Sequence, residues 1–185
     1  GAIGNGDYFC LRDPHGIRPC HYLITDEFIA VASERVPLMT VFEVESEQVQ
    51  ELPPANMLSI KADGTHVITE FTTPLKPTPC SFEKIYFSRG NDPIVYRERK
   101  ALGAALTPQI VDSLEDRFDK SAITYIPNTA ETAYYGLLEG LRVYRRKRVH
   151  AQLLEALRNG TLDENMLDSA LLKRWPRGEK IAHKD

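Results

Sequence analysis

The chain has 185 residues, 42% of them hydrophobic, and its formal net charge at pH 7 is −3. This size can bury one good core or two small ones, and the charge gives no reason to expect nucleic acid or an anionic membrane as a partner. No apolar run approaches the roughly 20 residues of a membrane-spanning helix. The three cysteines (Cys10, Cys20 and Cys80) are scattered and odd in number. They suit a reducing cytoplasm, so we expect a cytoplasmic protein.

Short strands separated by turns are expected over residues 7–71. The pair Asp63-Gly64 is the strongest short turn signal in the chain and predicts a hairpin. The stretch ERVPLMTVF predicts one or two helical turns, interrupted by Pro37. The expected strands are Tyr8–Arg12, His21–Thr25, Phe28–Ala32, Val49–Leu52, Asn56–Lys61 and Thr65–Phe71.

The stretch TTPLKPTP, residues 72–79, separates this part of the chain from the next. Three prolines in eight residues exclude a regular element and indicate an extended linker, with a domain boundary near residue 75. Beyond it the hydrophobic period becomes helical. Asp92-Pro93 has the residue types of a helix start, and Thr107-Pro108 predicts a kink or a restart of that helix.

Two capping boxes predict two further helices. Asn128 with Glu131 opens the first, which carries Ala133, Leu137, Leu138 and Leu141 on one face. Thr161 with Glu164 opens the second, which is expected to end at Trp175-Pro176. The stretch AITYIP, residues 122–127, has the composition of a buried strand. A helix, a strand and a helix in this order suggest the beginning of an α/β unit.

Five motifs occur in an order that is typical of one enzyme family. They are LRDPHGIRP at 11–19, VASE at 31–34, ELPP at 51–54, CSFEKIYFSRG at 80–90 and YIPNTAE at 125–131. Over residues 7–139 the chain thereby resembles the glutamine phosphoribosylpyrophosphate amidotransferases. Looser forms of the first two motifs occur in related glutaminases, so the stretch at 80–90 is the discriminating one.

The resemblance implies a mixed α+β or α/β fold in two parts. Residues 1–75 would be the end of an N-terminal-nucleophile (class II) glutaminase β-sandwich. Residues 76–185 would be the junction and the helical start of a phosphoribosyltransferase-type α/β domain. The expected reaction transfers the amide nitrogen of glutamine to phosphoribosylpyrophosphate, giving phosphoribosylamine, glutamate and pyrophosphate for purine synthesis. Small-molecule substrates, Mg²⁺, homo-oligomers and, in some members, an iron–sulfur cluster go with this family.

Neither catalytic centre of the family is complete in this sequence. Gly1 is not the nucleophilic cysteine, and the loop that cradles phosphate, a pair of aspartates followed by a hydroxyl residue and RGT, does not occur. We therefore expect an internal fragment of a longer protein, inactive by itself in both half-reactions.

The long motif at 11–19 raises the question of why so many charged residues and prolines stand where a two-residue turn could join two strands. A structural role is expected for Arg12, Asp13, Gly16 and Arg18, which could tie neighbouring strands together through charge-assisted hydrogen bonds. Direct contact with substrate is the alternative.

Other candidates follow from the resemblance, each with a structural alternative. Tyr86 and Arg89 match residues that couple the two sites, although Tyr86 could instead alternate with Phe87 across a strand. Cys80 matches an iron–sulfur ligand but is expected to be an inert thiol. Lys184 matches a pyrophosphate contact, with a solvated lysine as the alternative.

Two further motifs favour structural interpretations. Asn5-Gly6 is expected to form a turn before a strand, although such pairs bind glutamine elsewhere in the family. The basic run RRKR at 145–148 is expected to be a solvated helix face, with a phosphate or nucleic-acid patch as the alternative.

The chain also departs from the family pattern. Residues 88–92 read SRGND, and the stretch from 144 to 175 has no clear counterpart. These differences indicate a divergent branch. They keep two alternatives open: another class II glutamine amidotransferase with a different acceptor, or a non-catalytic regulatory paralogue.

Overall fold

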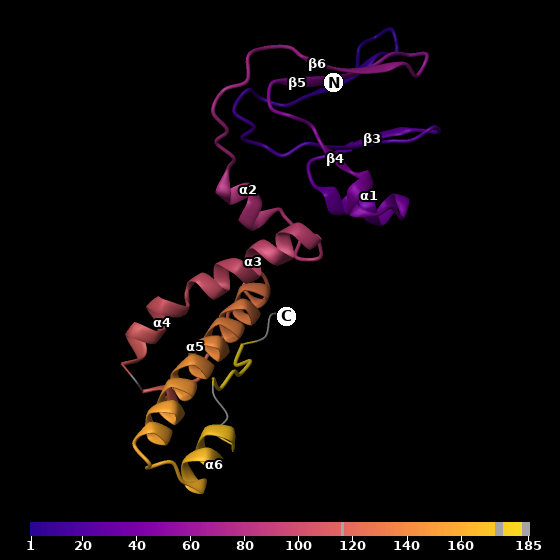
Figure 1. Ribbon diagram of the computed structural model, residues 1–185. Helices are drawn as coiled ribbons and strands as arrows, with labels where there is room; N and C mark the ends of the chain where they lie inside the picture. The colour runs from indigo at the N-terminus through magenta and orange to yellow at the C-terminus, as the bar shows by residue number, and fades with distance from the viewer. Residues whose placement is uncertain (116, 173–175, 183–185) are drawn as a thin grey trace. The chain divides into compact units, whose positions relative to one another are not determined.

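The computed structural model describes residues 1–115, 117–172 and 176–182. The chain divides into two compact units, Gly1–Val95 and Tyr96–Asp185. Small antiparallel sheets make up much of the first unit and helices dominate the second, so the class is α+β (Figure 1). Across the described residues, no helix is both long and apolar enough to cross a membrane. The expected boundary near residue 75 concerns domains of a whole enzyme and stays a prediction.

The first unit contains two three-stranded antiparallel sheets. Each predicted strand is confirmed, with ends a residue or two shorter where turn residues begin. One sheet has the order β1 (Tyr8–Leu11), β5 (Asn56–Ile60) and β6 (His66–Glu70), and the other has the order β3 (Ile29–Ala32), β2 (His21–Ile24) and β4 (Gln50–Glu51).

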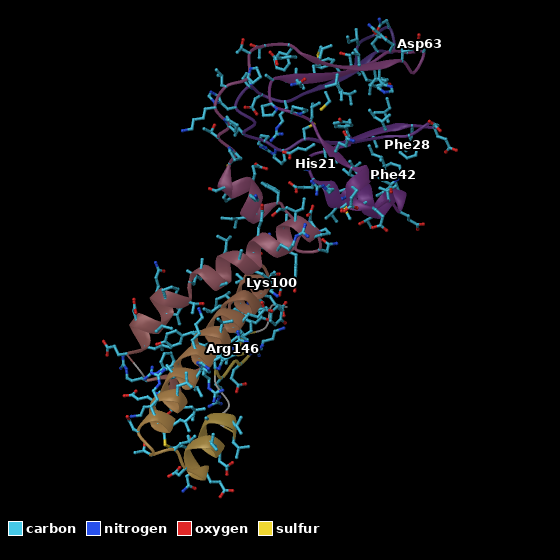
Figure 2. All side chains as sticks on the ribbon, viewed as in Figure 1. His21, Phe28, Phe42, Asp63, Lys100 and Arg146 are labelled. Atoms are coloured by element: carbon cyan, nitrogen blue, oxygen red, sulfur yellow. The ribbon has the colours of Figure 1, made fainter. Side chains whose placement is uncertain are left out.

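The hydrophobic core of this unit has two layers because side chains alternate along the strands. Cys20, Tyr22, Leu52 and Leu58 form the layer between the two sheets. Leu23, which points the other way from β2, packs with Leu38 and Val49 against the helix α1 (Arg35–Phe42). The rings of Phe28 and Phe42 stack at 4.4 Å in this second layer (Figure 2).

Helix α1 corrects one expectation, because it runs through Pro37 without a break. Pro37 is the third residue of the helix, where a backbone N–H has no partner within the helix. Proline therefore loses no hydrogen bond there. A 3₁₀ turn, η1 (Ser46–Gln48), leads into β4.

The predicted hairpin between β5 and β6 is confirmed. Ile60 pairs with His66, and Gly64 takes a left-handed conformation with φ of 87°. Asp63, at the tip of the hairpin in Figure 2, accepts hydrogen bonds from the backbone N–H and hydroxyl of Thr65 at 2.9 and 2.7 Å. Asp63 and Gly64 thus shape the turn locally, and the distant Asp7 also accepts the N–H of Ala62 at 3.0 Å.

The proline-rich stretch 72–79 forms no helix or strand, as predicted, and is followed by the short helix α2 (Ser81–Tyr86). The alternative that Tyr86 and Phe87 alternate across a strand is therefore wrong. In the helix, Phe82 and Tyr86 stand four residues apart and their rings stack at 5.2 Å. This spacing favours the helix over an extended strand.

The second unit is built on the long helix α5 (Glu131–Arg158), with α3 (Pro93–Ala105), α4 (Thr107–Leu114) and α6 (Glu164–Leu172) beside it (Figure 1). The predicted helix start at Asp92-Pro93 is confirmed, since Asp92 Oδ1 accepts the N–H of Ile94 at 2.8 Å. The restart at Thr107-Pro108 is also confirmed. Leu137, Leu138 and Leu141 form the buried face of α5, as expected.

Glycine allows α3 and α5 to approach closely. A methyl group on Gly103 would collide with the backbone of Ala133, and one on Gly136 would collide with the backbone of Lys100. Next to this crossing, Lys100 on α3 forms an ion pair with Glu139 on α5 (Figure 2).

Three expectations in this unit are wrong. Residues 122–127 form no strand; Ile123 makes a single parallel bridge to Gly178. One bridge cannot build a sheet, so the α/β unit is not seen in the described residues. Asn128 is not the cap of α5, which follows Ala130 without a side-chain cap. Glu131 instead accepts hydrogen bonds from the hydroxyls of Tyr125 and Tyr135.

The cap of α6 also differs from the prediction. Asp163, not Thr161, accepts the N–H of Met166 at 2.7 Å, while the Thr161 hydroxyl donates to the carbonyl of Ala156. An aspartate closer to the helix supplied the same chemistry as the predicted threonine. The expected end at Trp175 lies outside the described residues.

Candidate functional site

The loop at residues 12–18 is organised by the carboxylate of Asp13. It accepts backbone hydrogen bonds from His15 at 3.0 Å and from Ile17 at 2.9 Å, with a longer one from Arg18 at 3.5 Å. Burial raises the pKa of Asp13, but the N–H groups of Ile17, Arg18 and His15 together hold that pKa below its ordinary value. Gly16 completes the turn in a left-handed conformation with φ of 60°. One carboxylate thus fixes the path of the loop.

Arg12 joins this loop to the neighbouring strand. Its guanidinium donates to the carbonyls of Arg18, Leu52 and Gly16 at 3.0, 2.7 and 3.3 Å. It also forms an ion pair with Glu51 at 2.8 Å, and only 10% of the side chain is exposed. Three backbone acceptors and a carboxylate match the fixed fork of donors in arginine, which lysine could not replace.

The loop at residues 12–18 also binds the backbone of the proline-rich segment and of the residue that follows it. The N–H groups of Leu75, Thr78 and Cys80 donate to the carbonyls of Pro14, His15 and Ile17 at 2.9–3.0 Å. All three bonds run in one direction, from the linker backbone to the loop carbonyls, and neither segment is a strand. A two-residue turn could not offer three carbonyl acceptors, which answers why the loop is long.

One ion pair extends the connection to helix α2. Arg18 Nε lies 3.0 Å from Glu83 Oε1, and Glu83 is buried while Arg18 is 67% exposed. A buried carboxylate needs such a partner, since removing a charge from water without one is costly. The loop therefore fixes both the linker segment and the helix that follows it.

Further charged groups gather near Glu83. Burial, followed by the charges of Glu83 and Asp92, raises the pKa of Glu34, and Arg89 opposes the rise. Arg35 Nη1 lies 4.0 Å from Asp92 Oδ2, and both side chains are mostly buried. With Arg18 on Glu83, the result is a partly buried cluster of three carboxylates and three arginines, in which the carboxyl of Glu34 binds a proton more readily than usual.

His21 lies at the edge of this cluster. Its side chain is buried and its Nδ1 is 3.1 Å from the carbonyl oxygen of Ser33. Burial lowers the pKa of His21, although the bond to Ser33 and the charge of Glu51 act in the opposite direction. The neutral imidazole is therefore favoured in the folded state.

The coupling candidates lie at the start of the junction. Tyr86 is 70% exposed and packs its ring on Phe82 and Phe87. Arg89 is exposed, and its charge acts on Glu34. The positions are compatible with a surface that another part of a larger enzyme could cover, and the coupling role stays a prediction.

The described residues do not build a metal site. No three His, Cys, Asp or Glu side chains within them come together as a metal would need. Cys80 is half-buried before α2, and the donors described around it do not fit an iron–sulfur cluster, which needs four ligands. The Mg²⁺ and iron–sulfur predictions stay untested, and Lys184 lies outside the described residues.

The two remaining motifs have structural contacts. The Asn5 side-chain oxygen accepts the N–H of Asp7 at 3.0 Å, and Gly6 has φ of 91°, so the predicted turn is confirmed. In the basic run, Arg145 donates to the carbonyl of Ala170 and so fastens α6 to α5. Arg146, labelled in Figure 2, is exposed on α5.

Comparison with known proteins gives several partial matches. No family model matches the chain. The amidophosphoribosyltransferase of Pasteurella multocida is 30% identical over 137 residues, 69% of this chain and 26% of its own length. The enzyme of the same name from Mycobacterium tuberculosis is 37% identical over 89 residues, 48% of this chain and 16% of its own length.

A solved structure matches a larger share of the chain. The glutamine phosphoribosylpyrophosphate amidotransferase of Bacillus subtilis, complexed with ADP and GMP, is 27% identical and covers 72% of this chain, with a TM-score of 0.54. The chain is a divergent relative of the amidophosphoribosyltransferases. It spans about a sixth to a quarter of the length of the curated relatives it matches.

Four of the five motifs of the amidophosphoribosyltransferase resemblance interact with one another within the first unit. Arg12 of the first motif binds Glu51 and Leu52 of ELPP, and Arg18 binds Glu83 of the junction motif. The charge of Glu83 contributes to the raised pKa of Glu34 in VASE. The sequence interpretation quoted these motifs but named neither Glu34 nor Glu83 as a site residue. The available signal was an acidic residue in each of two motifs, together with the two arginines of the motif at 11–19 and Arg89 of the junction motif.

Proposed function

We propose that these residues are part of an enzyme that transfers the amide nitrogen of glutamine to phosphoribosylpyrophosphate. The products would be phosphoribosylamine, glutamate and pyrophosphate, in purine synthesis. One observation carries the proposal: three of the five motifs of the amidotransferase resemblance, at 11–19, 51–54 and 80–90, are joined through Arg12 and Arg18. The partial matches to curated relatives of that name support it.

Within this proposal the first part of the chain is the end of the glutaminase sandwich, up to about residue 75. The following residues are the junction and the start of the phosphoribosyltransferase-type domain. The loop at 12–18 holds the junction segment in place, since it binds the backbone of residues 75–80 and the side chain of Glu83. Tyr86 and Arg89 then stand where a second catalytic domain could sense the state of the first.

The whole enzyme would be cytoplasmic and homo-oligomeric, with Mg²⁺ at its phosphoribosyl centre. An iron–sulfur cluster bound through Cys80 would need ligands from outside the described residues. We expect these 185 residues alone to catalyse neither half-reaction, because they contain neither the expected nucleophile nor the expected phosphate loop.

The test uses the longest natural chain that contains these residues. It is supplied with glutamine, phosphoribosylpyrophosphate and Mg²⁺, and glutamate and pyrophosphate are measured together. Release of both in equal amounts is the expected result. Glutamate without pyrophosphate would overturn the proposed acceptor and favour another class II amidotransferase. Absence of both products would favour the regulatory paralogue.

The coupling role has its own variant. Arg89→Met should leave glutamate release active while pyrophosphate release falls several-fold, because the two sites would no longer respond to each other. Arg97→Met, which removes another exposed arginine nearby in the sequence, is the matched control and should keep the two products equal. Equal loss of both products in Arg89→Met would contradict a coupling role.

A further inference from the structure

Two thiols face each other at the base of the loop. Cys10 lies in β1 and Cys20 directly precedes β2, and their Sγ atoms are 3.2 Å apart. The two strands belong to different sheets. Both cysteines are free. The sulfur atoms would need to approach by about 1 Å to reach disulfide bonding distance, which small side-chain rotations can supply.

The surroundings of the two thiols differ. Cys20 is 8% exposed and packs in the core between the sheets with Tyr22, Leu52 and Leu58. Cys10 is half-buried and lines an open cavity of about 980 Å³, bordered also by Phe9 and Ile60. Cys10 therefore lies at the wall of the cavity, which is the side from which a small molecule would approach it, while Cys20 is covered.

The loop between the two cysteines is the one that carries the linker segment. It contains Arg12, Asp13 and Arg18, and its carbonyls bind the backbone N–H groups of residues 75, 78 and 80. A covalent link between positions 10 and 20 would close this loop into a ring. Such a ring restricts the open forms of the loop more than its folded form.

We propose that Cys10 and Cys20 form a reversible disulfide when the protein meets a hydroperoxide, and that this bond locks the loop between them. The inference does not depend on the proposed enzyme activity. It assigns a redox-sensitive site to two residues that the amidotransferase interpretation does not use.

The chemistry has two steps. The sulfur of Cys10 attacks the peroxide, the O–O bond breaks, and Cys10 becomes a sulfenic acid while the leaving oxygen takes a proton to form water or an alcohol. The sulfur of Cys20 then attacks the sulfur of Cys10 and the S–O bond breaks. The departing hydroxide takes up a proton from water, which balances the proton that Cys20 has lost, and forms water. The two thiols together lose two electrons to the peroxide.

Cys20 is suited to the second step only. Burial, together with the neighbouring Cys10, raises the pKa of the Cys20 thiol to about 12. It therefore stays protonated near neutral pH and is a poor first target for a peroxide. Because its thiolate is the attacking form in the second step, formation of the disulfide should become faster as the pH rises from 7 to 9.

The experiment uses the full 185-residue chain with Cys80→Ser, so that only the two thiols remain. The reduced protein is treated with one equivalent of hydrogen peroxide, blocked with iodoacetamide and mapped by mass spectrometry without reduction. We expect a linked peptide pair containing Cys10 and Cys20, the loss of two hydrogens in mass, and full reversal by dithiothreitol. The backbone amides of residues 15–18, 75, 76, 78 and 80 should exchange several-fold more slowly in the oxidised form.

Clear outcomes would overturn the proposal. These are a folded chain in which peroxide leaves both thiols alkylatable, a stable sulfinic acid at Cys10, or disulfides that join only separate chains. A matched pair of variants separates the steps: Cys20→Ala should accumulate a sulfenic acid that dimedone traps, and Cys10→Ala should leave Cys20 unmodified. Circular dichroism verifies that each variant is folded. The mapping of the two-thiol chain decides the question if either variant is not.

Discussion

Each of the two compact units is stabilised internally by a different kind of contact. In residues 1–95, charged side chains bind the backbone: Arg12 and Asp13 between them hold carbonyls and N–H groups of the loop. In the described part of 96–185, helices pack where side chains are missing, at Gly103 and Gly136. The first unit therefore depends on hydrogen bonds between charged side chains and the backbone. The second depends on the absence of side chains at the positions where two helices meet.

The same contrast decides what a single substitution does. Removing Arg12 leaves the partly buried carbonyls of Leu52 and Gly16 without this donor, and a polar group left unpaired away from water costs more than its hydrogen bond contributes. Adding one methyl group at Gly103 forces two backbones apart, although alanine is the better helix former by about 1 kcal/mol. Each unit should therefore fail by its own mechanism.

The largest effect is expected for Arg12→Met, which keeps much of the apolar stem of the side chain. We expect the free energy of unfolding of residues 1–95 to fall by about 3 kcal/mol, because three carbonyls and Glu51 lose their partner. Hydrogen exchange in urea, followed on peptides from residues 8–60, measures it.

The control for this prediction is Arg146→Met, which removes an exposed arginine from α5 and should change stability by less than about 0.5 kcal/mol. Equal effects of the two variants would show that the first unit does not depend on its buried guanidinium.

An intermediate effect is expected for Gly103→Ala. The new methyl group meets the backbone of Ala133 and Leu137, which cannot move aside like a side chain. We expect the free energy of unfolding of the helical unit to fall by about 2 kcal/mol, the usual range for overpacking. Exchange of amides in α5 measures the change, and exchange in β1 to β6 should stay constant.

Gly4→Ala is the matched control, because a methyl group there meets nothing within 4 Å. A Gly103→Ala variant as stable as the parent, or more stable, would mean that the close approach of α3 and α5 does not hold the unit together.

The smallest effect concerns pH and the first unit. Because burial lowers the pKa of His21 in the folded state, the unfolded chain binds the proton more readily. The free energy of unfolding should therefore fall as the pH drops below the ordinary histidine pKa of about 6.5, by at most about 1.4 kcal/mol per pH unit. Above that pH this contribution is constant.

The measurement is urea-dependent exchange of residues 8–60 at pH 7.5 and 5.5, corrected for the intrinsic rate at each pH. The charges that act on His21 come from Glu51, Arg35 and Asp92, and all three remain in the variant His21→Gln. The difference between parent and variant in how stability changes with pH therefore measures the contribution of the imidazole. His66→Gln changes an exposed histidine and should keep the parent slope. If the stability of His21→Gln changed with pH as much as that of the parent, His21 could not be the origin of the pH dependence.

The first unit was largely predictable from sequence, and the reason is local. Alternating side chains and turn residues such as Asp63-Gly64 carry their information within a few positions, so the strands were found nearly residue by residue. The expected break at Pro37 is wrong, because the effect of a proline on a helix depends on its distance from the helix start. The candidate site was found only as separate motifs.

The second unit was predicted less well. The apolar stretch at 122–127 has strand composition, but a strand needs a partner over several residues, and the described chain supplies a single bridge at Ile123. Helix α6 is capped by Asp163 and not by Thr161, because more than one polar residue near its start could serve, whereas α5 begins after Ala130 with no side-chain cap. Composition could not choose among these polar residues.

By itself, the sequence determined the strands, the hairpin, the linker, most of the helices and the relationship to one enzyme family, since each of these depends on neighbours in the chain or on a motif. Only the tertiary structure decided that Arg12 and Arg18 hold motifs 40 and 65 positions away, at Leu52 and Glu83. It also placed the sulfur atom of Cys10 beside that of Cys20, and it brought the backbones of α3 and α5 close together at Gly103. Contacts between distant residues arise when sheets and helices pack, and no local pattern records which side chains that packing brings together.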